Sequence, residues 1–325
     1  MSFTITRRAL GYASLALLAA APARAQEDWP TQTVTIIVPF AAGGSTDAVA
    51  RILAHQLSID LGQQFIVDNR AGATGTIGFA AVARSEPDGY TLGLGPGSTY
   101  AMAPHLYKLP YDAERAFTGI GPIATMPMFM VVPRDSPAKT LPEFLELAKQ
   151  PESAVSYAHA GAGSSMQLAV ELFLQIAGVE VQGVSYRGSA PAIQGLLTGD
   201  TQMSMPPASA VMSFLKSGDL RAIAVSTKER SPIAPDVPTV AEQGFPDYEV
   251  VEEVALVAPA GTPESILRRL HQATATAFAN PEVQKRLAVL AVSPALGRVE
   301  DWPTYIAAEN KKWREVIESR NIKIE

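Results

Sequence analysis

The sequence predicts an α/β fold, in which strands and helices alternate along the chain. The first observation is "TVTIIVPF" (Thr33–Phe40), a continuous run of β-branched and apolar residues that is typical of a strand buried on both faces. The second is the helical spacing of the apolar residues that follow, from Ala48 to Leu57. The third is that strand, glycine-rich turn and helix recur several times, which favours βαβ units and a parallel sheet.

The other elements of the first hundred residues follow in order. "LGQQ" ends the first helix, and "QFIVDN" (Gln64–Asn69) predicts a second short strand. "NRAGATGTIG" is a glycine-rich turn before a helix over Phe79–Arg84. "PDGYTLGLG" (Pro87–Gly95) predicts a turn followed by a third strand.

The same pattern continues towards the C-terminus. Met128–Pro133 predicts a strand, and "TLPEFLELAK" predicts a helix with Thr140 as its N-cap. "VSYAHAGAGSSMQLAVELFLQIAG", "VQGVSYRGSAPAIQGLLTGD" and "TQMSMPPASAVMSFLKSGDLRAIAVST" each begin with a strand that leads through a turn or loop into a helix. A strand over Glu253–Gly261 and two helices complete the fold. "PRDSPAKT" and "KERSPIAPDVPTV" are expected to be surface loops.

Composition narrows the possible classes of protein. The chain has 325 residues, of which 47% are hydrophobic and 18% charged, so it can bury a large core. It has no cysteine, which excludes disulfides, thiolate metal sites and cysteine nucleophiles. The net charge of −6 disfavours nucleic acid and anionic membranes as partners.

The N-terminus has the pattern of an export signal. Arg7 and Arg8 precede an Ala/Leu-rich segment that ends in Ala23-Arg24-Ala25. We therefore expect residues 1–25 to be a signal peptide cleaved before Gln26, with the Sec and twin-arginine routes both open. The apolar core is too short to anchor the chain well in a membrane. Removing this segment takes away three arginines and no acidic residue, which changes the net charge from −6 to −9.

Four turns pair glycine with serine just before a predicted helix. Glycine lets a ligand approach the backbone, the first turn of a helix has unpaired N–H groups, and hydroxyls add neutral donors. Such turns suit a carboxylate or a phosphate. The alternative is that each serine or threonine is an ordinary N-cap. The four turns are Ala41–Asp47, Gly95–Tyr100, Ala160–Met166 and Tyr186–Ala192.

Motifs for nucleotides, metals and catalysis are missing or incomplete. "AGGSTD" lacks the lysine of a P-loop, no complete G-x-G-x-x-G run opens the first helix, and "GAGSS" is not a G-x-S-x-G elbow. The four histidines form no H-x-x-x-H pair, so we expect no metal and no cofactor. His159 stands shortly before a Gly-Ser turn, where it is either a ligand contact or a packed histidine of the core.

Eight stretches, in order along nearly the whole mature chain, are similar to one family. They are "IIVPFAAGGSTDAVAR", "VDNRAGATGTIG", "PDGYTLGLG", "LYKLPYDAERAFTGI", "YAHAGAGSS", "SYRGSAPA", "LRAIAVSTKERSPIAPDVPTVAEQG" and "VAPAGTPE". On these stretches the chain resembles the Bug family of solute receptors, the extracytoplasmic binding proteins associated with tripartite tricarboxylate transporters.

The resemblance implies a two-lobed periplasmic-binding-protein fold with a ligand cleft between the lobes. Two crossover strands would join the lobes near Thr125–Val131 and near Tyr248–Val257. One lobe would comprise residues 26–124 plus 254–325, and the other residues 125–253.

The resemblance also implies where the ligand lies. A ligand carboxylate would be held by the first strand–helix turn and by the Gly-Ser-Ser turn of the opposite lobe, while the turn at Tyr186 also lines the cleft. Asp47 is assigned to capping or orienting its turn, because a carboxylate cannot donate a hydrogen bond. The candidate ligand-binding residues are Phe40, Ala41, Gly43, Gly44, Ser45, Thr46, Asp47, Ser98, Gly163, Ser164, Ser165, Met166, Tyr186, Gly188, Ser189, Ala190, Pro207 and Glu253.

Three departures from the family pattern bear on the ligand. Many relatives have Phe-Asp-Asn where this chain has Pro206-Pro207-Ala208, and the missing acid disfavours an amino-acid ligand. Relatives often carry an aromatic pair where Glu253 and Val254 stand. If Glu253 faces the cleft, it opposes a second carboxylate; if it faces solvent, the pocket is only less aromatic. Met166 replaces a common histidine and removes a polar contact.

The sequence thus predicts a periplasmic receptor, not an enzyme, that captures a small-molecule carboxylate between two lobes for a tripartite tricarboxylate-type transporter. We expect a monomer whose partners are membrane transporter subunits or a sensor. Two alternatives stay open. One is a secreted hydrolase or transferase with Ser164 or Ser165 as nucleophile and His159 as base. The other is an orphan ligand sensor without a transport partner.

Overall fold

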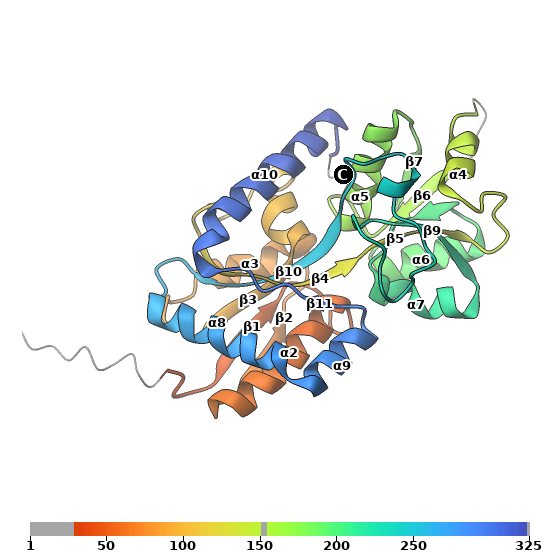
Figure 1. The fold of residues 1–325 in the computed structure, drawn as a ribbon. Helices are drawn as coiled ribbons and strands as arrows, with labels where there is room; N and C mark the ends of the chain where they lie inside the picture. Colours follow the sequence, from red (N-terminus) through yellow and green to blue (C-terminus); the bar gives the residue numbers. More distant parts are fainter. Residues whose placement is uncertain (1–28, 151–154, 324–325) are drawn as a thin grey trace, which may run out of the picture.

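The computed structural model describes residues 29–150 and 155–323, which form two β-sheets with helices packed against them (Figure 1). The signal peptide expected over residues 1–25 lies outside the described residues. The two sheets occupy opposite halves of the view in Figure 1, so that the molecule has two lobes. The predicted α/β class and the two-lobed arrangement are both confirmed.

The first lobe is built on a six-stranded sheet. β1 pairs in parallel with β2 and with β3, so the carboxyl ends of these three strands lie at the same edge. β10 runs antiparallel between β3 and β4. In the order in which they lie in the sheet, the strands are β11 (Ser293–Pro294), β4 (Phe117–Pro127), β10 (Val251–Pro259), β3 (Thr91–Pro96), β1 (Val34–Val38) and β2 (Phe65–Asn69).

The second lobe is built on a five-stranded sheet. β6 pairs in parallel with β7 and β8, and β5 pairs antiparallel with β8 and β9. In sheet order the strands are β7 (Gln182–Ser185), β6 (Ser156–His159), β8 (Met203–Ser204), β5 (Phe129–Pro133) and β9 (Leu220–Val225).

Helices cover both sheets with their apolar faces. In α2, for example, the buried residues include Val49, Leu53 and Leu57, which recur at the predicted helical spacing. The helices of the first lobe are α2 (Ser45–Leu61), α3 (Thr76–Ala83), α8 (Glu264–Ala279), α9 (Pro281–Val289) and α10 (Trp302–Ser319). Those of the second lobe are α4 (Leu141–Ala148), α5 (Ser165–Ala177), α6 (Ser189–Thr198) and α7 (Ala208–Ser217).

The chain crosses between the sheets twice, and one serine ties the crossings together. β4 continues through Met128 into β5, and the chain returns through Val250 into β10. The hydroxyl of Ser226, which is fully buried, accepts from the Met128 N–H at 3.0 Å and donates to the Val250 carbonyl at 2.5 Å. The lobe boundaries expected at residues 125 and 254 fall inside β4 and β10, and they stay a prediction.

The C-terminal helix makes a further connection. Figure 1 shows α10 extending from the first lobe towards α5 of the second. Just beyond α10, Arg320 forms ion pairs with Glu171 of α5 at 2.7 Å and with Glu180 at 2.6 Å. The side chains of Arg320 and Glu171 are only 13% and 12% exposed, so solvent screens this pair less than a surface pair.

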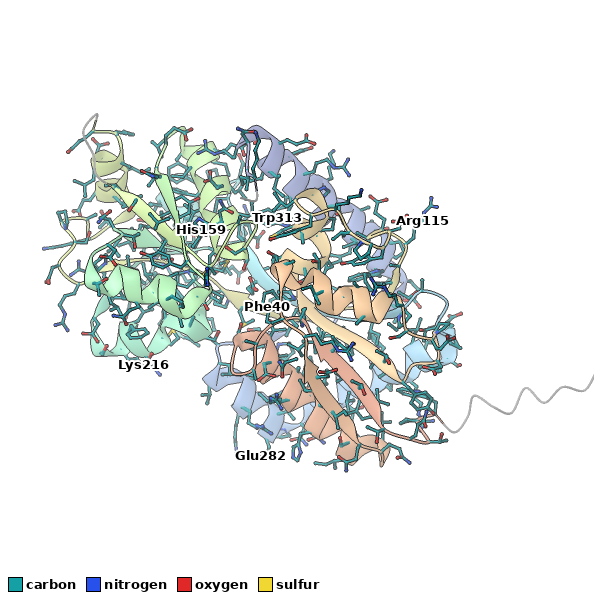
Figure 2. The ribbon with its side chains drawn as sticks, turned by 180° about the vertical axis from the view of Figure 1, so that it is seen from behind. Phe40, Arg115, His159, Lys216, Glu282 and Trp313 are labelled. Atoms are coloured by element: carbon teal, nitrogen blue, oxygen red, sulfur yellow. The ribbon has the colours of Figure 1, made fainter. Side chains whose placement is uncertain are left out.

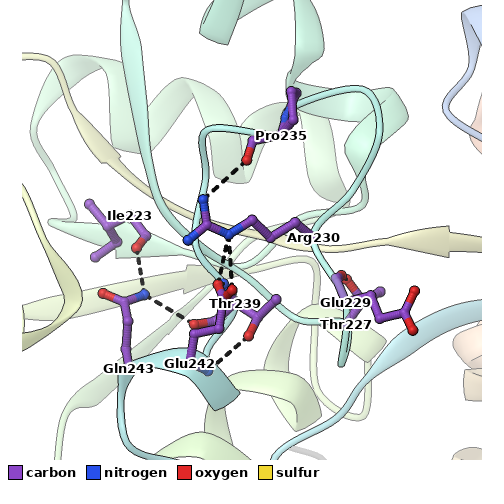
Figure 3. Close-up of polar contacts among 8 residues, drawn as sticks. All are labelled: Ile223, Thr227, Glu229, Arg230, Pro235, Thr239, Glu242 and Gln243. Atoms are coloured by element: carbon purple, nitrogen blue, oxygen red, sulfur yellow. Dashed lines mark hydrogen bonds and ion pairs between the residues drawn. The ribbon is translucent and has the colours of Figure 1, made fainter.

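The proline-rich loop after β9 is held by a polar network (Figure 3). Both carboxylate oxygens of Glu242 accept from Arg230 Nε, at 3.0 and 2.9 Å. Glu242 and Thr239 also cap each other, because each backbone N–H donates to the other's side chain at 2.8 or 2.9 Å. Gln243 donates to the Ile223 carbonyl at 3.0 Å, which attaches the loop to β9.

The structure differs from the sequence prediction in several elements, and among them helix α9 and the short strand β11 were not predicted. Gly95–Tyr100 does not lead into a regular helix; β3 extends to Pro96 and is followed by a π-helical turn, η2 (Ser98–Met102). The long strand β4 was not predicted from the residue pattern, because its glycines and prolines are unfavourable in strands. No helix within the described ranges is long and apolar enough to cross a membrane.

Candidate functional site

Asp47 holds the turn between β1 and α2. Its carboxylate accepts hydrogen bonds from the Gly43 N–H, Arg51 Nε and Asn69 Nδ2, all at 2.9 Å. Asn69 also donates to the Phe40 carbonyl at 3.0 Å, so both ends of the turn are fixed. Burial raises the pKa of Asp47, but the bonds from Arg51, Gly43 and Asn69 together hold it below its ordinary value. Asp47 therefore stays ionised and orients the turn.

Helix α2 begins without a side-chain cap. Its N-cap is Gly44, and Ser45 is the first helical residue rather than the cap. Ala48 N–H is the first to bond back, to the Gly44 carbonyl at 3.0 Å. The N–H groups before it have no partner within the helix, and they carry the positive end of the helix dipole.

Two helices of the second lobe begin in the same way. The N-cap of α6 is Gly188 and that of α7 is Pro207, and neither side chain can accept a hydrogen bond. Gly188 has a φ of 117°, a conformation that favours glycine. Ser189 is the first residue of α6 and Ser209 the second of α7, so both hydroxyls stand in the first helical turn.

The three helix starts meet at one cavity of about 410 Å³, to which both lobes contribute. Figure 2 shows Phe40, just before the β1–α2 turn, where the two halves of the ribbon meet. The cavity is lined by Gly43, Gly44, Ser45, Ala48, Ser189, Ala190, Ile193, Gln194, Leu197, Pro207, Ser209, Ala210, Phe214 and Leu290. Six of these residues belong to the predicted set, namely Gly43, Gly44, Ser45, Ser189, Ala190 and Pro207.

The turn before α5 is satisfied by its own side chains instead. Ser164 is a true N-cap, because its hydroxyl accepts from the Gln167 N–H at 3.3 Å. The Gln167 side chain in turn accepts from the Gly163 N–H at 2.8 Å. The N–H groups of Gly163 and Ser164, which the resemblance assigned to a ligand, thus have acceptors within the turn, namely Gln167 Oε1 and the Gly161 carbonyl. Gly163 and Ser164 are not among the residues that line the cavity.

Ser98 and Glu253 lie at a second, much smaller cavity of about 30 Å³ beside α10. The Glu253 carboxylate accepts a hydrogen bond from the hydroxyl of Tyr305, which lies 3.1 Å from the hydroxyl of Tyr100. Glu253 thus packs partly buried against α10 and does not line the larger cavity. The Glu253 side chain thus neither lines the larger cavity nor points freely into solvent, which were the two orientations considered from the sequence.

The neighbouring Glu252 is buried in the same region. The Ser165 side chain hydrogen-bonds its carboxyl, which connects α5 with the crossover strand β10. Burial raises the pKa of Glu252 to about 7, a rise that the Ser165 bond partly offsets and that the Glu253 charge increases. Burial likewise raises the pKa of Glu253 to about 7. Two carboxyls with raised pKa values thus lie on the strand that joins the lobes.

The remaining predicted residues support these turns rather than line the cavity. Thr46 and Met166 are buried. Ala41 lies in the β1–α2 turn but not at the cavity. The Tyr186 side chain packs so closely on Gly195 of α6 that a Cβ there would lie 2.2 Å from its hydroxyl. Eight of the residues that line the cavity were not predicted from the sequence. Only those in α7 could have been found from the sequence, because a strand, two prolines and a helix follow one another there. The eight are Ala48, Ile193, Gln194, Leu197, Ser209, Ala210, Phe214 and Leu290.

His159 is 4% exposed, and its Nδ1 lies 3.0 Å from the Gly161 carbonyl. Because a carbonyl only accepts, Nδ1 donates in this bond. Burial lowers the pKa of His159, which favours the neutral ring. In the described ranges no hydrogen bond connects His159 to Ser164 or Ser165, and both serines have other partners. The hydrolase hypothesis therefore gains no support from this geometry.

Two α/β lobes with a shared cavity and two crossover strands define the periplasmic-binding-protein class. Residues 49–322 match the family described as "Tripartite tricarboxylate transporter family receptor" (TctC). The chain belongs to this family, and it is a solute-binding receptor of the tripartite tricarboxylate type.

Solved structures of similar proteins agree with this assignment and confirm the resemblance to the Bug family. The periplasmic binding protein BugD is 32% identical, with a TM-score of 0.80 over 91% of this chain and 100% of that chain. Rpa4515 of R. palustris, solved with adipate, is 33% identical, with a TM-score of 0.84 over 91% and 100%. MatC of Rhodopseudomonas palustris, solved with bound malate, is 33% identical, with a TM-score of 0.78 over 89% and 100%.

The role of Asp47 in the turn can be tested by Asp47→Asn. We expect the free energy of unfolding to fall by about 1–3 kcal/mol at pH 7, because Gly43, Arg51 and Asn69 lose an ionised acceptor that is itself buried. The loss should shrink as the pH falls below 3.8, the ordinary pKa of the carboxyl, because the lowered native pKa gives no stability once both states are protonated. The measurement is urea unfolding followed by circular dichroism.

The matched control for Asp47→Asn is Asp68→Asn. Asp68 pairs with Arg70 at 2.8 Å, but its side chain is 39% exposed. An exposed pair contributes about 1 kcal/mol or less, so this variant should differ little from the wild type. Equal losses in the two variants would contradict a special role for Asp47.

The buried Glu252 predicts an unusual pH dependence. Its native pKa of about 7 lies above the ordinary 4.5, so the unfolded chain releases this proton first and the free energy of unfolding falls as the pH rises from 4.5 to 7. Glu252→Gln removes this titration. The variant should be more stable than the wild type by roughly 1–3 kcal/mol at pH 8, and the difference should vanish near pH 4.5.

Melting temperatures measured across this pH range test the Glu252 prediction. Glu114→Gln is the control, because Glu114 is an exposed glutamate and its replacement should leave the pH profile unchanged. A Glu252→Gln variant whose profile runs parallel to that of the wild type would show that Glu252 does not titrate in this window.

Proposed function

We propose that this receptor binds a small carboxylate in the cavity where α2, α6 and α7 begin. One observation carries the proposal. Three helices, which come from both lobes, begin at this cavity, and none of their N-cap residues has a side-chain acceptor. Their first-turn N–H groups and the hydroxyls of Ser45 and Ser189 then serve as donors to the ligand headgroup. The Ser209 hydroxyl donates to Met126 Sδ at 3.9 Å and must rotate to join them. No positively charged side chain is needed.

The energetics of such a site suffice for a transport receptor. A hydrogen bond to a charged group contributes roughly 1.5–3 kcal/mol, and micromolar binding corresponds to about 8 kcal/mol. Three or four donors can therefore supply much of this free energy after the cost of ordering the ligand is subtracted. The structures of relatives with adipate and with malate support a carboxylate as the ligand class.

The proposal assigns the predicted residues to two groups. Gly43, Gly44, Ser45, Ser189, Ala190 and Pro207 contact the ligand, together with Ser209. Phe40, Ala41, Thr46, Asp47, Tyr186 and Gly188 shape the turns that present them. The remaining predicted residues, which are those of the α5 turn, Ser98 and Glu253, lie outside this cavity.

The wider setting of the receptor is part of the same proposal. Residues 1–25 direct export to the periplasm, where a monomer closes its lobes, residues 26–124 plus 254–325 and residues 125–253, around the ligand. It then delivers the ligand to the membrane subunits of a tripartite tricarboxylate-type transporter, and it has no enzymatic activity of its own.

Isothermal titration and thermal shift with a panel of mono- and dicarboxylates test the ligand class. Ligand-free protein should gain several degrees in melting temperature with at least one acid at saturating concentration. A folded, ligand-free protein that responds to none of the panel would refute the proposal.

The donor site itself is tested by Ser45→Asp against Ser45→Asn. The two side chains have nearly the same size, but only aspartate brings a negative charge to the first turn of α2. Because helices tolerate an acid at this position, Ser45→Asp should remain folded. Its affinity for the carboxylate should be lower than that of Ser45→Asn by about tenfold or more, which equals 1.4 kcal/mol or more. Equal affinities of the two variants would show that the carboxylate headgroup does not bind at the start of α2.

A further inference from the structure

Apart from Gln194, the part of the cavity lining that lies beyond the helix starts is apolar. It consists of Ile193 and Leu197 of α6, Phe214 of α7 and Leu290 at the end of α9, which we call the apolar wall. Among the described residues no Asp, Glu, Lys, Arg or His lines the cavity. Apart from the three serines, Gln194 is the one polar side chain in the lining.

This composition distinguishes between classes of carboxylate. A second carboxylate on the ligand would lose its hydration against the apolar wall, which offers it neither a helix start nor a cation. An ammonium group would find no acid, because Asp47 is already bound by Arg51 and Asn69 behind the turn. A methyl group or an aromatic ring would instead be removed from water, which is favourable.

We propose that this receptor is selective for monocarboxylates whose remaining body is apolar, and that the apolar wall determines this selectivity. The inference rests on the proposed carboxylate site and adds to it the chemistry of the ligand's other end. The headgroup meets neutral donors from three helices, and the body meets Leu197, Phe214 and Leu290.

Ligands that share one carbon chain and differ only at its far end give the sharpest test. Hexanoate, adipate and ε-aminocaproate end in a methyl, a carboxylate and an ammonium group, and benzoate and terephthalate form a matched aromatic pair. Titration calorimetry on the purified, ligand-free protein should show that the better of the two monoacids binds at least about tenfold tighter than the matching compounds that carry a charge at the far end.

A variant can transfer the preference to the diacid. Leu197→Arg places a cation in the apolar wall, so the affinity ratio of adipate to hexanoate should rise by about tenfold or more. Thr198→Arg is the control, because it adds the same charge one residue further along α6, at an exposed position that does not line the cavity. Its ratio should equal that of the wild type.

The outcomes separate the two proposals. Adipate or terephthalate binding as tightly as the matching monoacid in the wild type overturns the selectivity and leaves the carboxylate site intact. The same conclusion follows if Leu197→Arg, shown to be folded by its melting curve, leaves the ratio unchanged. If none of the acids binds, the carboxylate site itself fails, and the selectivity fails with it.

Discussion

The first backbone N–H groups of a helix need acceptors from outside the helix, and this requirement organises the molecule. Several helices satisfy it locally, because Thr140, Ser164 and Asn280 cap α4, α5 and α9 with their side chains. Helices α2, α6 and α7 do not, since glycine or proline stands at each N-cap. These three starts meet at one cavity, whereas α3, α8 and α10, which also lack a side-chain cap, begin elsewhere. The proposed anion site therefore depends on the convergence of uncapped helix starts from both lobes, and a missing cap alone does not define it.

The position of these helix starts depends on how the lobes are joined. α2 follows β1 of the first sheet, whereas α6 and α7 follow β7 and β8 of the second. Ser226 ties both crossing segments together, and Arg320 links the end of α10 to Glu171. The parallel strands of each sheet direct their carboxyl ends, and hence their helix starts, to one edge. Neither lobe alone provides the complete set of donors.

The sequence predicts the alternation of strands and helices well, because β-branched runs and helical spacing are local signals. It predicts the glycine turns but not which of them line the cavity. A local signal for this difference exists: Ser164 is followed three residues later by Gln167, which completes a capping box, whereas Ala48 and Ala192 stand at the equivalent positions after Ser45 and Ser189. The apolar wall has no such signal, because Leu290 joins it only through tertiary packing.

The arrangement of the helix starts also couples ligand charge to the approach of the lobes. Each helix start carries about half a positive charge, and those of the two lobes face the same cavity. Without an anion these like charges disfavour close approach of the lobes. The acidic net charge of the chain does not offset them locally, because none of the described acidic side chains lines the cavity. A carboxylate reverses the sign of the interaction across the cleft. A ligand shifts such an equilibrium only by binding one arrangement better than the other, and here the charge of the headgroup supplies that difference. A neutral molecule of the same shape would contact the apolar wall, but it would not reduce the repulsion between the helix starts of the two lobes.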